Sequence, residues 1–290
     1  MTSVSLLLVV LAAFIHASWN LLLKRTASVG PVFVFACTLV SCVAYAPWAL
    51  YLVVKGAIAW NWTVAGVILL SGSIHLAYSL CLQHGYRKAD LSVVYPVARG
   101  TGPMLSFFGA ILLLGEMPGG QALLGLGLVV GGIGLIATQG DLSAFRRPGG
   151  QEGVRWGTAT GGLIATYTVV DAYAVKVLAI APVVLDWFAN LVRLVMLAPL
   201  VASRPRHAWK TMRGHWPLAV GVGLLMPLSY ILVLAALGMG APLTLVAPMR
   251  EMSMMVGALM GMAVLRERVG GWRLVGCAVL IAGVVLLSSS

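Results

Sequence analysis

Charged residues are scarce in this sequence. Only 9% of its 290 residues are charged, against about 25% in soluble globular domains, whereas 60% are hydrophobic and the mean hydropathy is +0.99. This composition excludes a soluble globular enzyme and leaves a membrane protein with several spans. The four cysteines lie in apolar runs, with no CxxC pair and no His at metal-ligand spacing. They therefore predict neither a disulfide framework nor a metal site.

Ten apolar runs are long enough to cross a bilayer core of about 30 Å, which requires roughly 20 residues per helix. Breaks at Pro, Gly and basic clusters predict helices at 4–23, 30–54, 62–84, 89–114, 119–138, 154–175, 181–202, 214–236, 241–264 and 270–288. No basic residue precedes the first run, as it would in a cleaved signal peptide. We therefore expect an all-α integral membrane protein with ten transmembrane helices.

The basic residues predict how these spans are oriented. Fourteen Lys and Arg fall in loops on one side, and only Lys55 and Lys176 fall on the other. Basic loops remain in the cytoplasm, so both termini are expected on the non-cytoplasmic side of the inner membrane. Short loops thus account for the net charge of +11, and no nucleic-acid partner is predicted.

The chain repeats itself at a constant offset of 151 residues. This shift superposes Asn20 on Asp171, Arg99 on Arg250 and Glu116 on Glu267 without a gap. We expect two five-helix repeats, residues 1–138 and 154–290, joined by a polar cytoplasmic linker at 139–153. Because five is an odd number, the second repeat is inverted in the membrane. Inverted repeats are typical of secondary transporters, whose substrate site lies near the midplane between the halves.

The sequence resembles the drug/metabolite transporter superfamily, EamA type. The resemblance rests on the opening HASWNLLLK at residues 16–24 and on two repeat ends, Gly115-Glu116 to Gly125 and Arg266-Glu267 to Gly276. It covers essentially the whole chain and implies a metabolite permease, but it does not specify a substrate. The opening is also similar to that of members associated with phosphonate use in bacteria.

Two of the three arginines inside predicted spans, Arg99 and Arg250, are expected near the midplane from opposite directions. A charge at the bilayer centre costs about 2.5–3.5 kcal/mol even on the mildest scale, so both should face a cavity or a partner. As a pair they suit a carboxylate, phosphate or phosphonate, which guanidinium groups bind bidentately. The alternative is that Glu251 or another acid neutralises Arg250, and that the resulting ion pair only holds the two halves of the protein together. Pro96 and Pro248 precede the two arginines and predict kinks.

Polar residues at helical spacing predict a path between the halves. The residues that we expect along it, with the two arginines, are Glu251, His16, Asn20, Asp171, His75 and Tyr95. Interhelical hydrogen bonding without a substrate is the alternative for each of them. A second polar stripe, Asp186, Asn190 and Arg193, is interpreted as a self-satisfied structural ladder.

The function predicted from these features is transport of a small polar metabolite, anionic or zwitterionic, by alternating access. An exporter of lipophilic or cationic drugs is the main alternative, and an intramembrane enzyme is a further one. We predict no enzymatic activity because HExxH, GxSG and paired-acid motifs are missing. No cofactor is expected. Proton coupling and simple facilitation both remain open, as do a monomer and a homodimer.

Overall fold

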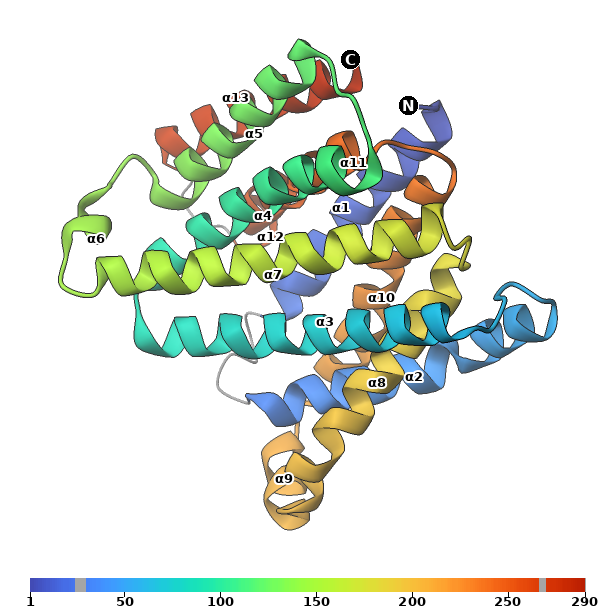
Figure 1. The fold of residues 1–290 in the computed structure, drawn as a ribbon. Helices are drawn as coiled ribbons and strands as arrows, with labels where there is room; N and C mark the ends of the chain where they lie inside the picture. Colours follow the sequence, from blue (N-terminus) through green and yellow to red (C-terminus); the bar gives the residue numbers. More distant parts are fainter. Residues whose placement is uncertain (24–29, 266–269, 290) are drawn as a thin grey trace.

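The computed structural model describes residues 1–23, 30–265 and 270–289, in which all regular structure is helical (Figure 1). Nine long helices carry the fold: α1 (Ser3–Leu23), α2 (Pro31–Val54), α3 (Trp62–Lys88), α4 (Leu91–Leu114), α5 (Gly120–Thr138), α7 (Gly150–Lys176), α8 (Pro182–Ala202), α10 (Trp216–Gly238) and α13 (Gly271–Ser288). Four shorter ones are α6 (Ser143–Arg146), α9 (Pro205–Met212), α11 (Leu243–Met249) and α12 (Met252–Leu265).

Eight helices in the described ranges are long and apolar enough to cross a membrane: α1, α2, α3, α4, α5, α8, α10 and α13. Their outward surface is apolar as well, since Val54, Trp62 and Leu112 are 86%, 93% and 81% exposed. Apolar exposure on this scale is atypical of soluble monomers and suits contact with lipid. The chain is therefore an all-α protein with the helices of a membrane-embedded one.

For nine of the ten segments expected from the sequence, both ends lie within four residues of the ends of an observed helix. The tenth, 241–264, differs because it consists of two helices, α11 and α12, with a break at Arg250 and Glu251. The linker expected at 139–153 holds the short helix α6, and α7 begins inside it at Gly150.

The break between α11 and α12 lies just after Pro248, a residue type at which helices commonly bend or break. Beyond it the backbone switches to shorter hydrogen-bonded turns: the Glu251 N–H donates to the Pro248 carbonyl at 3.1 Å, and the Met254 N–H donates to the Glu251 carbonyl at 2.9 Å. In α4, by contrast, Pro96 lies inside a continuous helix. Only one of the two predicted kinks therefore becomes a break.

The helices pack in pairs that join the two halves of the chain. Helix α4 lies along α7, α5 along α13, α1 along α10, and α2 along α8 (Figure 1). The contact of α5 with α13 depends on glycine: a Cβ placed on Gly132 would come within 2.8 Å of the Gly276 carbonyl oxygen, and one on Gly283 within 2.8 Å of the Gly125 carbonyl oxygen. These glycines thus serve packing within the chain, because a larger residue would push the two backbones apart.

Five charged residues used in the sequence argument lie outside the described residues. They are Lys24, Arg25, Arg266, Glu267 and Arg268. The orientation deduced from basic loops and the superposition of Glu116 on Glu267 consequently remain predictions from the sequence.

Candidate functional site

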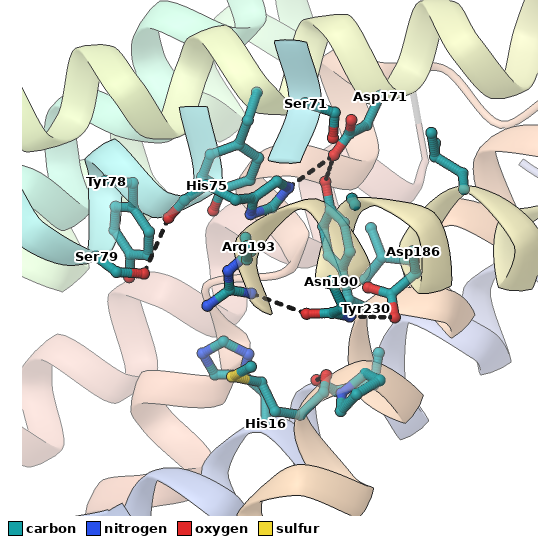
Figure 2. Close-up of a pocket in the computed structure, with 18 of the residues that line it drawn as sticks. His16, Ser71, His75, Tyr78, Ser79, Asp171, Asp186, Asn190, Arg193 and Tyr230 are labelled. Carbon is teal, nitrogen blue, oxygen red and sulfur yellow. Dashed lines mark hydrogen bonds and ion pairs between the residues drawn. The ribbon is translucent and has the colours of Figure 1, made fainter. Parts of the chain in front are cut away.

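A cavity of about 110 Å³ lies between α1, α3, α7, α8 and α10, beside the break that follows α11. Most of its polar lining comes from side chains deep inside the helices rather than from loops. The charged and polar residues on its wall are His16, Trp19, Ser71, His75, Tyr78, Ser79, Arg99, Tyr167, Asp171, Asp186, Asn190, Arg193, Ser229, Tyr230 and Arg250. Figure 2 shows ten of these side chains around the pocket.

Arg99 is held by partners from two other helical segments. Its Nη1 lies 3.3 Å from Oε2 of Glu251, which is 1% exposed, and its Nη2 lies 3.1 Å from Nε2 of His16. A guanidinium can only donate, so the His16 Nε2 must accept and this imidazole is neutral in the structure. The Tyr95 ring lies beneath the guanidinium, 5.6 Å from ring centroid to Cζ. Arg99 is therefore fixed in place, with one face left toward the cavity.

Arg250 sits at the break between α11 and α12, 6% exposed and on the cavity wall. Its closest acid is Glu251, whose Oε1 lies 3.9 Å from the Arg250 Nε. That Nε has no hydrogen-bond partner, and no hydrogen bond joins the rest of the guanidinium to the described part of the chain. Glu251 serves Arg99 more closely than Arg250, so the positive charge of Arg250 remains available to a ligand.

A third cluster centres on Asp171 of α7. The His75 Nε2 lies 2.9 Å from Asp171 Oδ2, and the Tyr230 hydroxyl donates to the same oxygen at 2.5 Å (Figure 2). The other oxygen, Oδ1, is buried without a partner, as is the Ser71 hydroxyl. The His75 ring stacks on Tyr167, with 4.0 Å between centroids. Asp171 is thus oriented by His75 and Tyr230 through one oxygen, and its other oxygen remains without a partner.

The ladder expected on α8 is present but incomplete. The Asn190 amide donates to Asp186 Oδ2 at 2.9 Å, and Arg193 donates to the Asn190 oxygen at 3.0 Å (Figure 2). The Arg193 Nε has no partner, and Asp186 Oδ1 accepts nothing from the described residues. The ladder of hydrogen bonds is therefore present as expected, but it does not satisfy all of its own groups, and all three residues also line the cavity.

Five of the eight residues expected on the path line the cavity: Arg99, Arg250, His16, Asp171 and His75. The other three do not. Glu251 stands behind Arg99, Tyr95 packs under the same guanidinium, and the Asn20 amide donates to the His16 carbonyl of its own helix at 2.8 Å.

Sequence reasoning missed Arg193, Asp186 and Asn190 as wall residues, although their spacing had marked them as one polar face. The usable signal was their charge inside an apolar helix, which requires a cavity or a partner. Trp19 was missed outright; its indole N–H donates to Ser229 at 3.2 Å across the pocket.

A separate ionic contact lies away from the cavity. Glu116, in the loop after α4, accepts from Lys176 at 2.7 Å, from the Leu243 N–H at 2.8 Å and from the Thr244 N–H at 2.9 Å. Burial favours the neutral acid, but the Lys176 and backbone hydrogen bonds outweigh it and lower the pKa of Glu116 below its ordinary value. This contact, which we call the Glu116 clasp, joins the ends of α4, α7 and α11.

Comparison with known proteins bears on the fold of the chain. No family model matches the chain, and no curated protein matches it. One solved structure, described as "Crystal structure of protein", matches at a TM-score of 0.76 and 16% identity, over 100% of this chain and 98% of that one. At this identity the likeness is one of fold alone. Within the described ranges, no group of three or more His, Cys, Asp or Glu side chains is placed to hold a metal ion.

Proposed function

We propose that the chain is a secondary transporter of the EamA-type drug/metabolite transporter superfamily, built from ten spans in two inverted five-helix repeats. In this arrangement the ten spans are the eight apolar helices named above, α7, and the pair α11 and α12, which together form one span. Both termini lie on the non-cytoplasmic side of the inner membrane. The position of irregular backbone at Arg250, next to a cavity, suits a transporter, whose broken helices line the substrate site.

The pairing of helices supports the two repeats. An offset of 151 residues relates α1 to α7, α2 to α8, α3 to α10 and α5 to α13. The contact of α1 with α10 then corresponds to that of α7 with α3, whereas the α2–α8 and α5–α13 contacts each correspond to themselves. Such a pattern is what a pseudo-two-fold axis between the halves produces.

The substrate in this proposal is a small polar metabolite that carries an acid group and moves by alternating access. The observation that carries it is the Arg250 guanidinium, buried on the cavity wall with no hydrogen bond to a described residue. A buried charge is costly when its only nearby acid is distant and is shared with a second arginine. A ligand carboxylate, phosphate or phosphonate would supply the missing bidentate contact.

Size and charge favour a metabolite over the alternative of a lipophilic or cationic drug. The cavity of about 110 Å³ is smaller than the roughly 300–1,000 Å³ typical of pockets for drug-sized ligands. Its wall carries three arginines, Arg99, Arg193 and Arg250, against two carboxylates, Asp171 and Asp186, so the wall offers more positive than negative groups and favours a ligand with an acid group.

The test is solute counterflow in proteoliposomes that contain the purified protein, with labelled amino acids, aminophosphonates, organic acids and a lipophilic cation. We expect exchange of at least one acid-bearing class. Arg250→Ala should abolish it, and Arg250→Lys should reduce it at least about tenfold because a lysine cannot bind bidentately. Arg204→Ala is the matched control, since Arg204 is exposed outside the long helices.

Two results would overturn the proposal. Exchange of the lipophilic cation alone would identify a drug exporter. Undiminished exchange by a folded Arg250→Ala protein would show that Arg250 does not bind the substrate.

A further inference from the structure

The cavity wall, together with Glu251 directly behind it, carries as many carboxylates as guanidinium groups. Arg99, Arg193 and Arg250 contribute three positive charges, and two acids on the wall, Asp171 and Asp186, together with Glu251 behind Arg99, contribute three negative charges. His16 is neutral because its Nε2 accepts from Arg99. A ligand with a net charge would upset this balance in a buried site, whereas a ligand with one charge of each sign would preserve it.

The unused hydrogen-bonding groups are of both signs as well. Two arginine donors on the wall lack a partner, Nε of Arg193 and Nε of Arg250. Arg193 still donates to Asn190 through Nη1, whereas Glu251, the acid nearest to Arg250, lies 3.3 Å from Arg99 and 3.9 Å from Arg250. The free acceptors are Oδ1 of Asp171 and Oδ1 of Asp186, whose other oxygen is taken by Asn190. An ammonium group has three N–H donors and no acceptor, which suits carboxylate oxygens of this kind.

We propose that the cavity selects small zwitterions, with the acid group on Arg250 and the ammonium group on the carboxylates of Asp186 and Asp171. This inference rests on the proposed transport function and narrows its substrate class. It also gives the α8 stripe a role. Arg193, joined to Asp186 through Asn190, keeps the Asp186 side chain in position, and Asp186 binds the ligand directly.

The test uses ligands matched in skeleton and different in charge. The melting temperature of the wild-type protein in detergent is measured with γ-aminobutyrate, butyrate and butylammonium, and then with alanine, propionate and propylammonium. A ligand that binds the folded state raises the melting temperature according to its affinity. In at least one triplet we expect the zwitterion to bind about tenfold more tightly than either of its singly charged analogues.

Asp186→Asn adds a readout that a purely structural role of Asp186 would not change. This variant keeps the side-chain shape and removes the charge. It should abolish the preference for the zwitterion, whereas the affinity for butyrate or propionate should stay the same or rise, because the variant has one negative charge fewer on the wall. Asp141→Asn is the control, because Asp141 is exposed in the loop after α5.

The outcomes distinguish a failure of the proposed zwitterion selectivity from a failure of the proposed transport function. If butyrate or propionate binds as tightly as the zwitterion of the same triplet, the proposed selectivity for zwitterions is wrong, but the proposed transport of acid-bearing metabolites is unaffected. If no acid-bearing ligand binds or exchanges, both fail. The wild-type panel decides the selectivity even where Asp186→Asn does not fold.

Discussion

Arg99 and Glu251 are 152 positions apart in the chain and form an ion pair with 3.3 Å between Nη1 and Oε2. The pair crosses from one half of the sequence to the other, and it occupies the acid nearest to Arg250. The two arginines that the offset of 151 superposes therefore differ in surroundings. Arg99 has an acid and a histidine as partners, whereas among the described residues Arg250 has only the more distant Glu251 oxygen. This asymmetry leads to a first prediction about stability.

Arg99→Ala should destabilise the protein more than Arg250→Ala does. Loss of Arg99 leaves the buried Glu251 without its closest partner, and breaking a buried pair in this way costs about 3–5 kcal/mol. Loss of Arg250 removes a guanidinium that has no hydrogen bond to the described residues, so the melting temperature of the ligand-free protein should stay level or rise. Thermal unfolding of both variants in the same detergent measures the difference. Equal losses would contradict it.

The Glu116 clasp should make stability depend on pH in the acid range. The pKa of Glu116 is lower in the folded protein than its ordinary value of 4.5, so the folded state binds this proton less readily than the unfolded state. The stabilisation is therefore complete above about pH 4.5 and is lost as pH falls through the lower folded-state pKa. Melting temperatures of wild type and Glu116→Gln should differ at about pH 6 and converge toward about pH 3. A constant difference would show that the Glu116 charge is not involved.

The close contact of α5 with α13 should not tolerate a methyl group. A Cβ at position 132 would lie 2.8 Å from the backbone oxygen of Gly276 and 2.8 Å from the backbone nitrogen of Leu280, so Gly132→Ala should cost about 1–3 kcal/mol through overpacking. Gly127 lies on the same helix, and a Cβ there would have no neighbour within 4 Å, so Gly127→Ala should be neutral or stabilising by up to about 1 kcal/mol. Thermal unfolding compares the two variants, and similar effects at both positions would refute the packing argument.

The proposed orientation can be tested by labelling from one side. Single cysteines at Lys55, just after α2, and at Arg206, on α9, should react with an impermeant maleimide from opposite sides of oriented vesicles. Position 55 is expected to react from the non-cytoplasmic side. Reaction of both from the same side would rule out the ten-span arrangement.

How far the sequence predicted the structure can be judged at particular residues. The helix ends could be predicted because Pro, Gly and basic clusters stop apolar runs, as they do near Pro31, Thr138 and Pro182. The different outcomes at Pro96 and Pro248 could not be predicted, because a proline can lie within a continuous helix or next to a break, and local sequence does not distinguish the two. For the site, five of eight expected residues line the cavity, whereas Asn20 turned to its own backbone, a local competition that helical spacing does not reveal.

The sequence by itself determined the class of protein, because length, hydropathy and scarcity of charge limit what a chain can bury or expose. It also marked Arg99, Arg250 and Asp171 as residues that need a partner, since a charge in an apolar helix must be compensated. Only the tertiary structure decided which residues are the partners of these three charged side chains. Which arginine takes Glu251, which oxygen of Asp171 stays free, and whether the α8 stripe faces a neighbour or the cavity depend on distances of a few ångströms between helices far apart in the chain. Such distances are set by packing, which local sequence patterns do not encode.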